Sequence, residues 1–392
     1  MEYRQFRGLR ISALGFGTMR YPLKEDRSID EELTEKLLKT AYENGVNYFD
    51  TAWPYHDGKS EGILAKSLSL YPRDTYYIAD KMPGHQFMDP FEPEKIFEAQ
   101  FKRLGTEYID FYLLHNVNDS CLDTYMDEEI GLIRYLSGER EKGRIKYLGF
   151  STHATVECLQ KFLDYLDEHG YKMDFVQIQL NYLDWILQNG KKKVEMLNEH
   201  GLPIWVMEPC RGGKLANLSE KDEDVLGILE PGKSDASWSF RWLMDVPGVT
   251  VILSGMNSME QLMDNLATFN EARPLSEKEK EVLSSIARGM MNSVPCTGCR
   301  YCVDHCPMGI DIPFMMERYN EYSFDNTLIP AVLMESKDKN TWPDACIKCG
   351  ACAAMCPQHI EIPKKMEELS VMVSKGVNWR ELCKKRNAIG KA

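Results

Sequence analysis

The sequence predicts a closed (β/α)8 barrel followed by a small, cysteine-rich α+β domain. Short apolar runs alternate with segments of helical spacing across residues 1–291, whereas eight of the twelve cysteines gather in two clusters beyond that point. A chain of 392 residues is also long for one hydrophobic core, which favours one large domain plus a smaller one. We therefore expect a barrel domain at 1–291, a second domain at 292–375 with a helical insertion at 313–340, and a C-terminal tail at 376–392.

A β-hairpin is expected before the barrel. Residues 2–6 and 9–14 alternate around Arg7-Gly8, which predicts two short strands that close the barrel floor. The first barrel strand is expected at 14–17, and seven more follow at 46–49, 76–79, 108–114, 145–150, 175–178, 203–207 and 249–253. The clearest helices between them are expected at 31–43, 93–104, 155–167, 191–200 and 237–243.

Strands that alternate with helices form parallel sheets with right-handed crossovers. Eight such repeats over about 250 residues favour a closed barrel over an open doubly wound sheet. An open nucleotide-binding sheet is also disfavoured because no Gly-x-Gly-x-x-Gly follows an early strand. Residues 215–233 are polar and contain Pro-Gly, so we expect an excursion after the seventh strand, and a charged helix at 277–287 then closes the domain.

The charge and hydropathy of the chain restrict its class. A net charge of −13 and a pI of about 5.3 argue against a nucleic-acid partner, since phosphate binding requires basic patches. The N-terminus lacks an apolar signal core, and no stretch approaches the ~20 apolar residues that span a bilayer. We expect a cytoplasmic protein without a membrane partner. Lys384-Lys385-Arg386 is too short for a basic patch and is expected to be a solvated end.

Polar and ionisable residues stand at the ends of successive predicted strands. Asp50 ends the second strand, Lys81 the third, His115 the fourth and Ser151 the fifth, and Tyr55 follows Asp50 in its loop. Each could be an ordinary loop residue on its own. In (β/α)8 barrels, however, the C-terminal ends of the strands form the active site. Their coincidence at successive strands therefore predicts a proton-transfer site.

Asp50, Tyr55, Lys81 and His115 resemble the catalytic tetrad of the aldo-keto reductase superfamily. The resemblance covers residues 1–270 and includes the motifs Gly15-Phe16-Gly17-Thr18 and Phe49-Asp50-Thr51-Ala52. It implies an oxidoreductase with a TIM barrel that reduces an aldehyde, a ketone or a sugar-like carbonyl with hydride from NAD(P)H. Tyr55 would then donate the proton.

The residue types suit that chemistry. A tyrosine with a pKa near 10 is a poor acid at neutral pH unless its phenolate is stabilised. The Lys81 ammonium is expected to lower that pKa, with Asp50 holding the lysine charged and oriented. His115 would position and polarise the carbonyl oxygen.

The same resemblance implies a set of dinucleotide contacts. They are Gly17, Thr18, Met19, Asp50, Ser151, Gln177, Met207, Gln261 and Asn265. Met207 stands where many members stack a tyrosine on the nicotinamide. Gly255-Met256 and Gln261 replace the cationic residues that clamp a 2′-phosphate in many members, which weakens the case for NADPH. Arg211 or Lys214 could substitute, so NADH and NADPH both remain open.

The two cysteine clusters share the spacing Cys-x-x-Cys-x-x-Cys-x-x-x-Cys-Pro, starting at Cys296 and at Cys346. This spacing is that of bacterial ferredoxins with two [4Fe–4S] clusters, in which the fourth cysteine of each run ligates the other cluster. One cluster is thereby assigned Cys296, Cys299, Cys302 and Cys356, and the other Cys346, Cys349, Cys352 and Cys306. A zinc site would leave the fourth cysteine and the proline of each run unexplained.

Two functions follow from these motifs. The first is an aldo-keto reductase that carries an iron-sulfur electron-transfer domain. The alternative is a ferredoxin-type electron-transfer protein whose barrel is a substrate or docking platform without nicotinamide turnover. Nicotinamide transfers two electrons as hydride, whereas each cluster transfers one, and no flavin site is recognisable. The clusters are therefore structural, or they exchange electrons with an external ferredoxin or flavoprotein or with a substrate that tolerates radicals. Tyr21, Trp53, His85 and Phe87 lie on strand-end loops and could line a substrate pocket.

Overall fold

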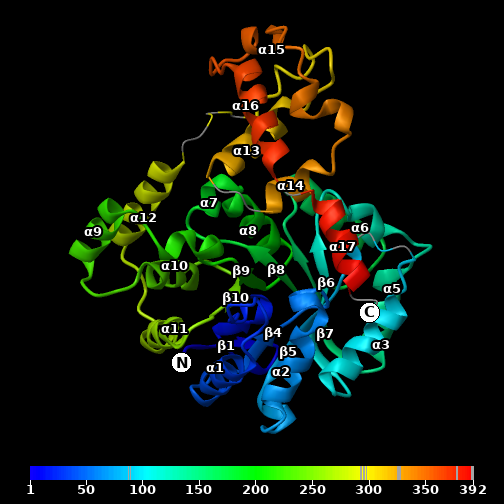
Figure 1. The fold of residues 1–392 in the computed structure, drawn as a ribbon, viewed down its shortest axis with the longest axis vertical. Coiled ribbons are helices and arrows are strands. Elements are labelled where there is room, and N and C mark those ends of the chain that lie inside the picture. Colours follow the sequence, from blue (N-terminus) through cyan, green and yellow to red (C-terminus); the bar gives the residue numbers. More distant parts are fainter. Residues whose placement is uncertain are drawn as a thin grey trace.

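The predicted barrel is confirmed in the computed structural model, which describes residues 1–86, 88, 90–291, 294, 296, 298–324, 328–376 and 378–389. Eight parallel strands close on themselves, each pairing with the next along the chain and β10 returning to β3 (Figure 1). The barrel strands are β3 (Leu14–Gly17), β4 (Tyr48–Asp50), β5 (Tyr77–Met82), β6 (Ile109–Val117), β7 (Ile145–Thr152), β8 (Phe175–Gln179), β9 (Ile204–Met207) and β10 (Val249–Ser254).

Helices surround the strands on the outside of the barrel (Figure 1). They are α1 (Glu31–Glu43), α2 (Ser60–Leu68), α3 (Pro93–Leu104), α4 (Leu122–Met126), α5 (Leu132–Glu141), α6 (Val156–Glu168), α7 (Asp184–Leu187), α8 (Gly190–Glu199), α9 (Glu220–Leu229), α10 (Asp235–Met244), α11 (Met259–Glu271) and α12 (Glu277–Met290). The five clearest helices expected from the sequence are all present. The excursion expected at 215–233 contains α9, which begins at a Ser219 cap.

The hairpin of β1 (Tyr3–Phe6) and β2 (Leu9–Ser12) closes one end of the barrel. Phe6 inserts among the aromatic side chains that fill the interior, with ring centroids 5.0 Å from both Tyr147 and Trp205 and 5.7 Å from Phe111. The barrel interior is thus packed from the floor upward. The open end of the barrel, at the C-terminal ends of the strands, is left for chemistry.

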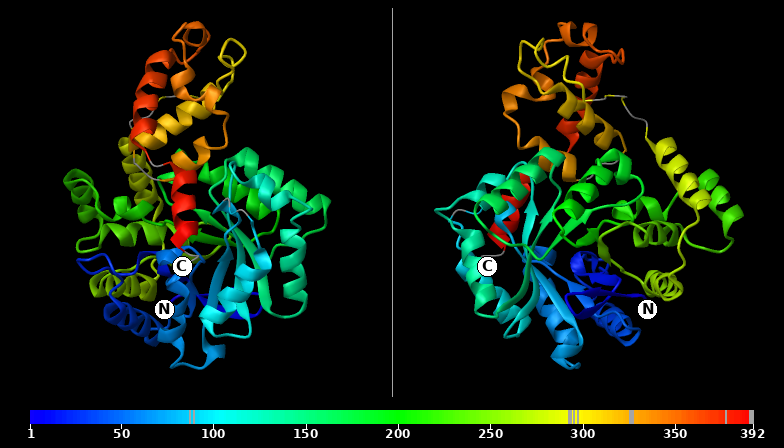
Figure 2. Two further views of the ribbon diagram at one scale, coloured as in Figure 1. Left: turned by 45° about the vertical axis from the view of Figure 1, so that its right-hand side comes forward. Right: turned by 180° about the vertical axis from the view of Figure 1, so that it is seen from behind.

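A second core lies outside the barrel and belongs to the cysteine-rich domain. It gathers buried residues such as Ile310, Met315, Met366 and Leu369. Its helices are α13 (Ile312–Phe324), α14 (Leu328–Met334), α15 (Ala351–Ala354) and α16 (Ile362–Lys375). Figures 1 and 2 place this domain above the barrel, with α13 and α14 nearer the barrel than α15.

The C-terminal segment differs from the expected solvated tail. Residues Trp379–Ile389 form a further helix, α17, that leaves the cysteine-rich domain and packs back onto the barrel (Figure 2). Lys384 and Lys385 are exposed as expected. Trp379 and Cys383, however, are only 5% and 0% exposed. The segment expected as a C-terminal tail is thus a helix whose apolar residues pack with those of α14, and which also contacts the turn after β5.

The structure also bears on membrane insertion. Within the described residues, no helix is long and apolar enough to cross a bilayer.

Candidate active site and cluster sites

Asp50 and Lys81 form a buried ion pair at the ends of two neighbouring strands. Asp50 ends β4 and pairs with Ala79 of β5, so that Lys81, two residues further along β5, points to the same face. The Lys81 ammonium Nζ lies 2.5 Å from Asp50 Oδ1 and donates a second hydrogen bond to the Thr51 carbonyl oxygen at 2.6 Å. The lysine side chain is 0% exposed and the aspartate 4%.

Tyr55 and His115 complete the cluster of four. Lys81 Nζ lies 5.0 Å from the centre of the Tyr55 ring. The His115 ring stands edge-on to Tyr55, with centroids 5.8 Å apart and an interplanar angle of 80°. Both residues are half-buried, unlike the ion pair behind them. The phenol and the imidazole therefore form the accessible side of the cluster.

A short strained loop presents Tyr55. It begins the 3-10 turn η2 (Tyr55–Gly58), within which His56 and Asp57 adopt left-handed backbone angles with φ of 52° and 55°. The His56 ring compensates by bridging to the first strand-end loop, with Nε2 3.1 Å from the Thr18 carbonyl oxygen and 3.2 Å from the Tyr21 amide nitrogen. Tyr21 stacks on the same ring at 5.1 Å. These contacts hold the loop in a conformation that would otherwise be costly.

The protonation of the cluster differs in one respect from the sequence-based expectation. Burial lowers the pKa of Lys81, but the neighbouring Asp50 and Tyr55 outweigh it and the net shift is upward, so the lysine is charged at neutral pH. Desolvation raises the pKa of Tyr55, and the Lys81 ammonium lowers it by a smaller amount. The expected net lowering of the Tyr55 pKa is therefore not found. Tyr55 carries its proton at neutral pH, as a proton donor must.

Two of the residues expected to contact a dinucleotide have a buried oxygen that could accept a hydrogen bond from a ligand. Gln177 Oε1 and Asp50 Oδ2 are buried and accept no hydrogen bond from any described residue. Each fits a group such as a carboxamide N–H or a ribose hydroxyl. Met207 lies beside Gln177, with 3.7 Å between its sulfur and the Gln177 Nε2. The orphaned acceptors are thus consistent with a nicotinamide at the ends of β4, β8 and β9.

The other expected dinucleotide residues are engaged within the protein. Ser151 Oγ accepts the Asn116 amide proton at 2.8 Å, and Thr18 Oγ1 accepts from Ser60 at 2.7 Å. Asn265 donates to Ser254 Oγ at 3.0 Å, and Gln261 Oε1 accepts the Asn257 amide proton at 3.0 Å. Gly17 lies at the end of β3, and the Met19 side chain after it is exposed.

Of the two cations suggested for a phosphate, Arg211 is unsuitable. Its side chain is 0% exposed and forms an ion pair with the equally buried Asp184. Lys214 is exposed. Sequence reasoning overlooked a third cation, Arg20, which ends the short turn η1 (Thr18–Arg20). Its stem lies 3.1–3.3 Å from where a Cβ at Gly255 would stand, and its Nη2 lies 3.5 Å from the equivalent point at Gly212.

Arg20 therefore crosses the space between the loops after β9 and β10. A Cβ at Gly255 would crowd the Arg20 stem, so the absence of a side chain there makes room for it, whereas a Cβ at Gly212 would stand in ordinary van der Waals contact with the guanidinium. The sequence offered one signal, since Arg20 directly follows the Gly17, Thr18 and Met19 run already expected to face the dinucleotide.

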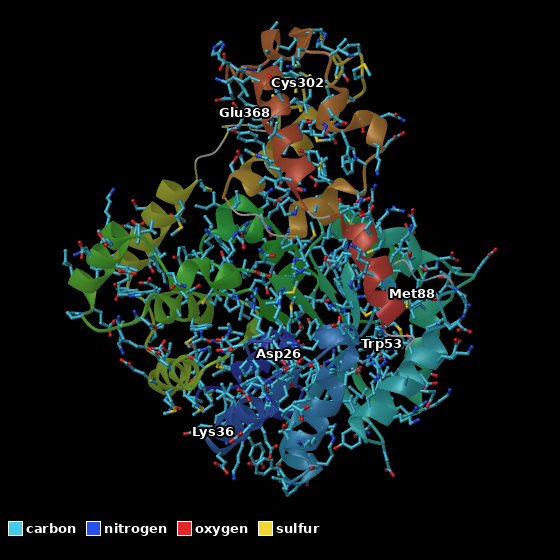
Figure 3. The ribbon with its side chains drawn as sticks, in the orientation of Figure 1. Asp26, Lys36, Trp53, Met88, Cys302 and Glu368 are labelled. Atoms are coloured by element: carbon cyan, nitrogen blue, oxygen red, sulfur yellow. The ribbon has the colours of Figure 1, made fainter. Side chains whose placement is uncertain are left out.

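The eight clustered cysteines line two concavities in the second domain. One is lined by Cys296, Cys299, Cys302 and Cys356, and the other by Cys306, Cys346, Cys349 and Cys352. Each takes three cysteines from one run and the fourth from the other run. Thiolates in groups of four suit iron-sulfur clusters. In the described part of the chain, no His, Cys, Asp or Glu side chains gather in a group that could hold a single metal ion. Figure 3 shows Cys302 at the end of the molecule far from the barrel.

The loop residues considered for a substrate pocket differ in how deeply they are buried and in what they contact. His85 is 3% exposed and packs beside His115, with centroids 4.5 Å apart. Trp53 is half-buried beneath the Arg103 guanidinium, which lies 3.8 Å from its ring centre. Tyr21 is buried under His56. Phe87 lies outside the described residues.

Comparison with known proteins agrees with this architecture. The aldo/keto reductase family model matches residues 13–288, and a 4Fe-4S dicluster domain model matches residues 295–361. The chain is 23% identical to L-galactose dehydrogenase of Arabidopsis thaliana, over 71% of this chain and 90% of that protein. It is 22% identical to the NADH-specific methylglyoxal reductase of Escherichia coli, over 62% of this chain and 84% of that protein.

Solved structures share the fold of the barrel. The holo form of an aldo-keto reductase from Bacillus halodurans superposes with a TM-score of 0.59 and 23% identity, covering 73% of this chain and 96% of that one. A thermostable aldo-keto reductase solved with the inhibitor epalrestat gives a TM-score of 0.58 and 25% identity, covering 73% of this chain and all of that one. This chain therefore belongs to the aldo/keto reductase family of NAD(P)-dependent oxidoreductases, and it carries a C-terminal 4Fe-4S dicluster domain.

Proposed function

We propose that the barrel reduces a carbonyl compound with hydride from NAD(P)H and a proton from Tyr55. The observation that carries this proposal is the convergence of a protonated phenol, an imidazole and a buried ammonium–carboxylate pair at the open end of the barrel. A bound nicotinamide would supply the hydride. The orphaned acceptors on Gln177 and Asp50 are the groups that would orient it.

The residues of the cluster divide the remaining work. Tyr55 donates its hydroxyl proton to the oxygen of the carbonyl as negative charge develops there. Lys81 stabilises the phenolate that remains, because its ammonium lies 5.0 Å from the ring and is held charged by Asp50. His115 stands at the edge of the Tyr55 ring, where it can hydrogen-bond the same oxygen.

The test is anaerobic oxidation of NADH and of NADPH with methylglyoxal and 4-nitrobenzaldehyde as probes. Tyr55→Phe removes the proton donor and should reduce kcat by about 10²- to 10⁴-fold, the usual contribution of a positioned acid. Tyr48→Phe is the matched control, since it removes a tyrosine hydroxyl from the packed barrel interior. Full activity in Tyr55→Phe, or no reduced-nicotinamide binding by the wild type, contradicts the proposal.

For the dinucleotide we propose that Arg20 contacts a phosphate group. The first turn of α11 offers Glu260 and no cation, which supports NADH over NADPH unless Arg20 supplies the missing charge. Arg20→Ala distinguishes the two phosphates. Weaker binding of both NADH and NADPH indicates the shared pyrophosphate, whereas weaker binding of NADPH alone indicates the 2′-phosphate. Unchanged dissociation constants for both contradict the role.

A second function, one-electron exchange with an external partner, is supported by the surface of the dicluster domain. Cys299 and Cys349 are exposed, and Tyr301 and Ile347 beside them are 63% and 60% exposed. A ferredoxin or a flavoprotein could approach the clusters there. Reduction of the clusters by reduced ferredoxin but not by NADH or NADPH would support this route, and no reduction by any of them would contradict it.

Thiolate ligands also require a reducing compartment, which supports a cytoplasmic location.

A further inference from the structure

The helix after the dicluster domain contacts the barrel close to the catalytic cluster. α17 runs from the dicluster domain down to the barrel, as Figures 1 and 2 show from three sides. It packs against α14 and against η4 (Gly84–Gln86), the turn that follows β5.

A chain of four ring-bearing residues runs from this helix to the proton donor, beginning at Trp379 and ending at Tyr55. The Trp379 indole stacks on the His85 imidazole with centroids 5.8 Å apart and an interplanar angle of 15°. His85 meets His115 edge-on at 4.5 Å, and His115 in turn meets Tyr55 edge-on at 5.8 Å. His85 is therefore enclosed between an indole and the catalytic imidazole, at 3% exposure, while His115 keeps an accessible side.

The backbone around these histidines is already anchored. The Tyr125 hydroxyl donates to the His115 carbonyl oxygen. The same Tyr125 ring lies 2.7 Å from where a Cβ at Gly84 would stand, so only glycine fits there. The rings of the two histidines are in contact as well. The Trp379 indole lies against the His85 ring, and His85 lies against His115, so movement of the indole would be transmitted to both imidazoles.

We propose that Trp379 is a positioning residue of the carbonyl site, which holds His85 and through it the ring of His115. The inference rests on the proposed function, and it adds a part of the site that lies beyond the dicluster domain. The chain can bring Trp379 to the barrel only through that domain, whose α14 packs against α17. Docking of the dicluster domain and alignment of His115 are thereby linked.

The kinetic test compares the anaerobic wild-type holoprotein with its Trp379→Ala variant. Trp379→Leu is measured as well, because it fills more of the space if the alanine variant loses iron from its clusters. With methylglyoxal, we expect kcat/KM to fall at least tenfold and its pH profile to change, while the dissociation constant for NADH and the cluster absorbance stay unchanged. Trp379→Phe, which keeps a flat ring, should recover most of the activity. The control is Trp342→Phe, since Trp342 packs in the dicluster core and donates to the Lys337 carbonyl oxygen. Equal loss in Trp342→Phe, or none in Trp379→Ala and Trp379→Leu, overturns the inference.

A second measurement does not require turnover. Diethylpyrocarbonate modifies accessible imidazoles, and peptide mass spectrometry resolves the rate at His85. Removing the indole in Trp379→Ala should accelerate modification of His85 at least tenfold, with Trp379→Phe close to the wild type. An unchanged rate overturns the inference whether or not the wild type reduces a carbonyl. Faster modification with no turnover in the wild type leaves the packing of His85 supported and contradicts the proposed function instead.

Discussion

The Asp50–Lys81 pair allows stability and catalysis to be separated by a double-mutant cycle. Both side chains are buried, and the ammonium has two short hydrogen bonds, to Asp50 Oδ1 and to the Thr51 carbonyl oxygen. Removing one partner of such a pair leaves a buried uncompensated charge, which costs about 3–5 kcal/mol. Replacing both partners with uncharged residues removes that penalty. Lys81→Met and Asp50→Asn should each destabilise the barrel, and the double variant should be closer to the wild type.

The expected size of the effect can be expressed as a melting temperature. For a domain of this class, 1 kcal/mol corresponds to about 2–4 °C, so each single variant should melt about 6–20 °C below the wild type. Activity should behave differently. On the proposed mechanism, Lys81→Met removes the cation that stabilises the Tyr55 phenolate, so kcat should fall in the single and in the double variant alike.

The assay combines anaerobic thermal unfolding, followed by tryptophan fluorescence, with NADH oxidation by methylglyoxal. Recovery of stability without recovery of kcat is the expected outcome for the double variant. Two results refute the reasoning: a Lys81→Met protein as stable as the wild type, or a double variant with wild-type kcat. The first would mean that the pair is hydrated, and the second that Lys81 does not act on Tyr55.

Three further predictions concern the pH dependence, the clusters and a helix cap. Burial raises the pKa of Glu321 to about 7, although the Arg318 charge opposes the shift. The folded protein therefore holds this proton more tightly than the unfolded chain, and its stability should fall as pH rises from 4.5 towards 7. Glu321→Gln should flatten this slope in thermal unfolding. Cys306→Ser removes a ligand of one cluster, and iron analysis should give ~4 rather than ~8 irons per chain, whereas Cys158→Ser should keep all of them. Ser276→Ala removes the capping box of α12 and should cost about 1 kcal/mol in unfolding free energy.

Much of the fold was predictable because its signals are local. The period of apolar residues placed all eight barrel strands, and β3, α1 and α3 have the predicted bounds. The convergence of Asp50, Tyr55, Lys81 and His115 was predictable for a related reason. Parallel strands bring their C-terminal ends to one rim, so four residues at successive strand ends must lie near one another. The spacing of the cysteines along the chain likewise predicts which four thiolates lie together in each group.

Other features depend on contacts between segments far apart in the chain. Arg211 was a candidate for a phosphate from its position in the sequence, but its pairing with Asp184 removes it from solvent. Arg20 was overlooked because it lies beside Gly212 and Gly255, which no local pattern in the sequence joins to it. The pKa of Tyr55 rises rather than falls because desolvation outweighs the charge of Lys81, a balance that only packing sets.

The sequence by itself therefore determined a barrel with Asp50, Tyr55, Lys81 and His115 at one rim and a domain with two groups of four cysteines, since periodicity and spacing are written along the chain. Only the tertiary structure decided that the chain returns from the dicluster domain to place Trp379 on His85. The sequence marked this segment only as a tail because a helix of eleven residues with exposed lysines carries no local signal of what it covers. The imidazole on which Trp379 stacks stands almost 300 positions earlier in the chain, and burial of the indole there is a property of the folded chain alone.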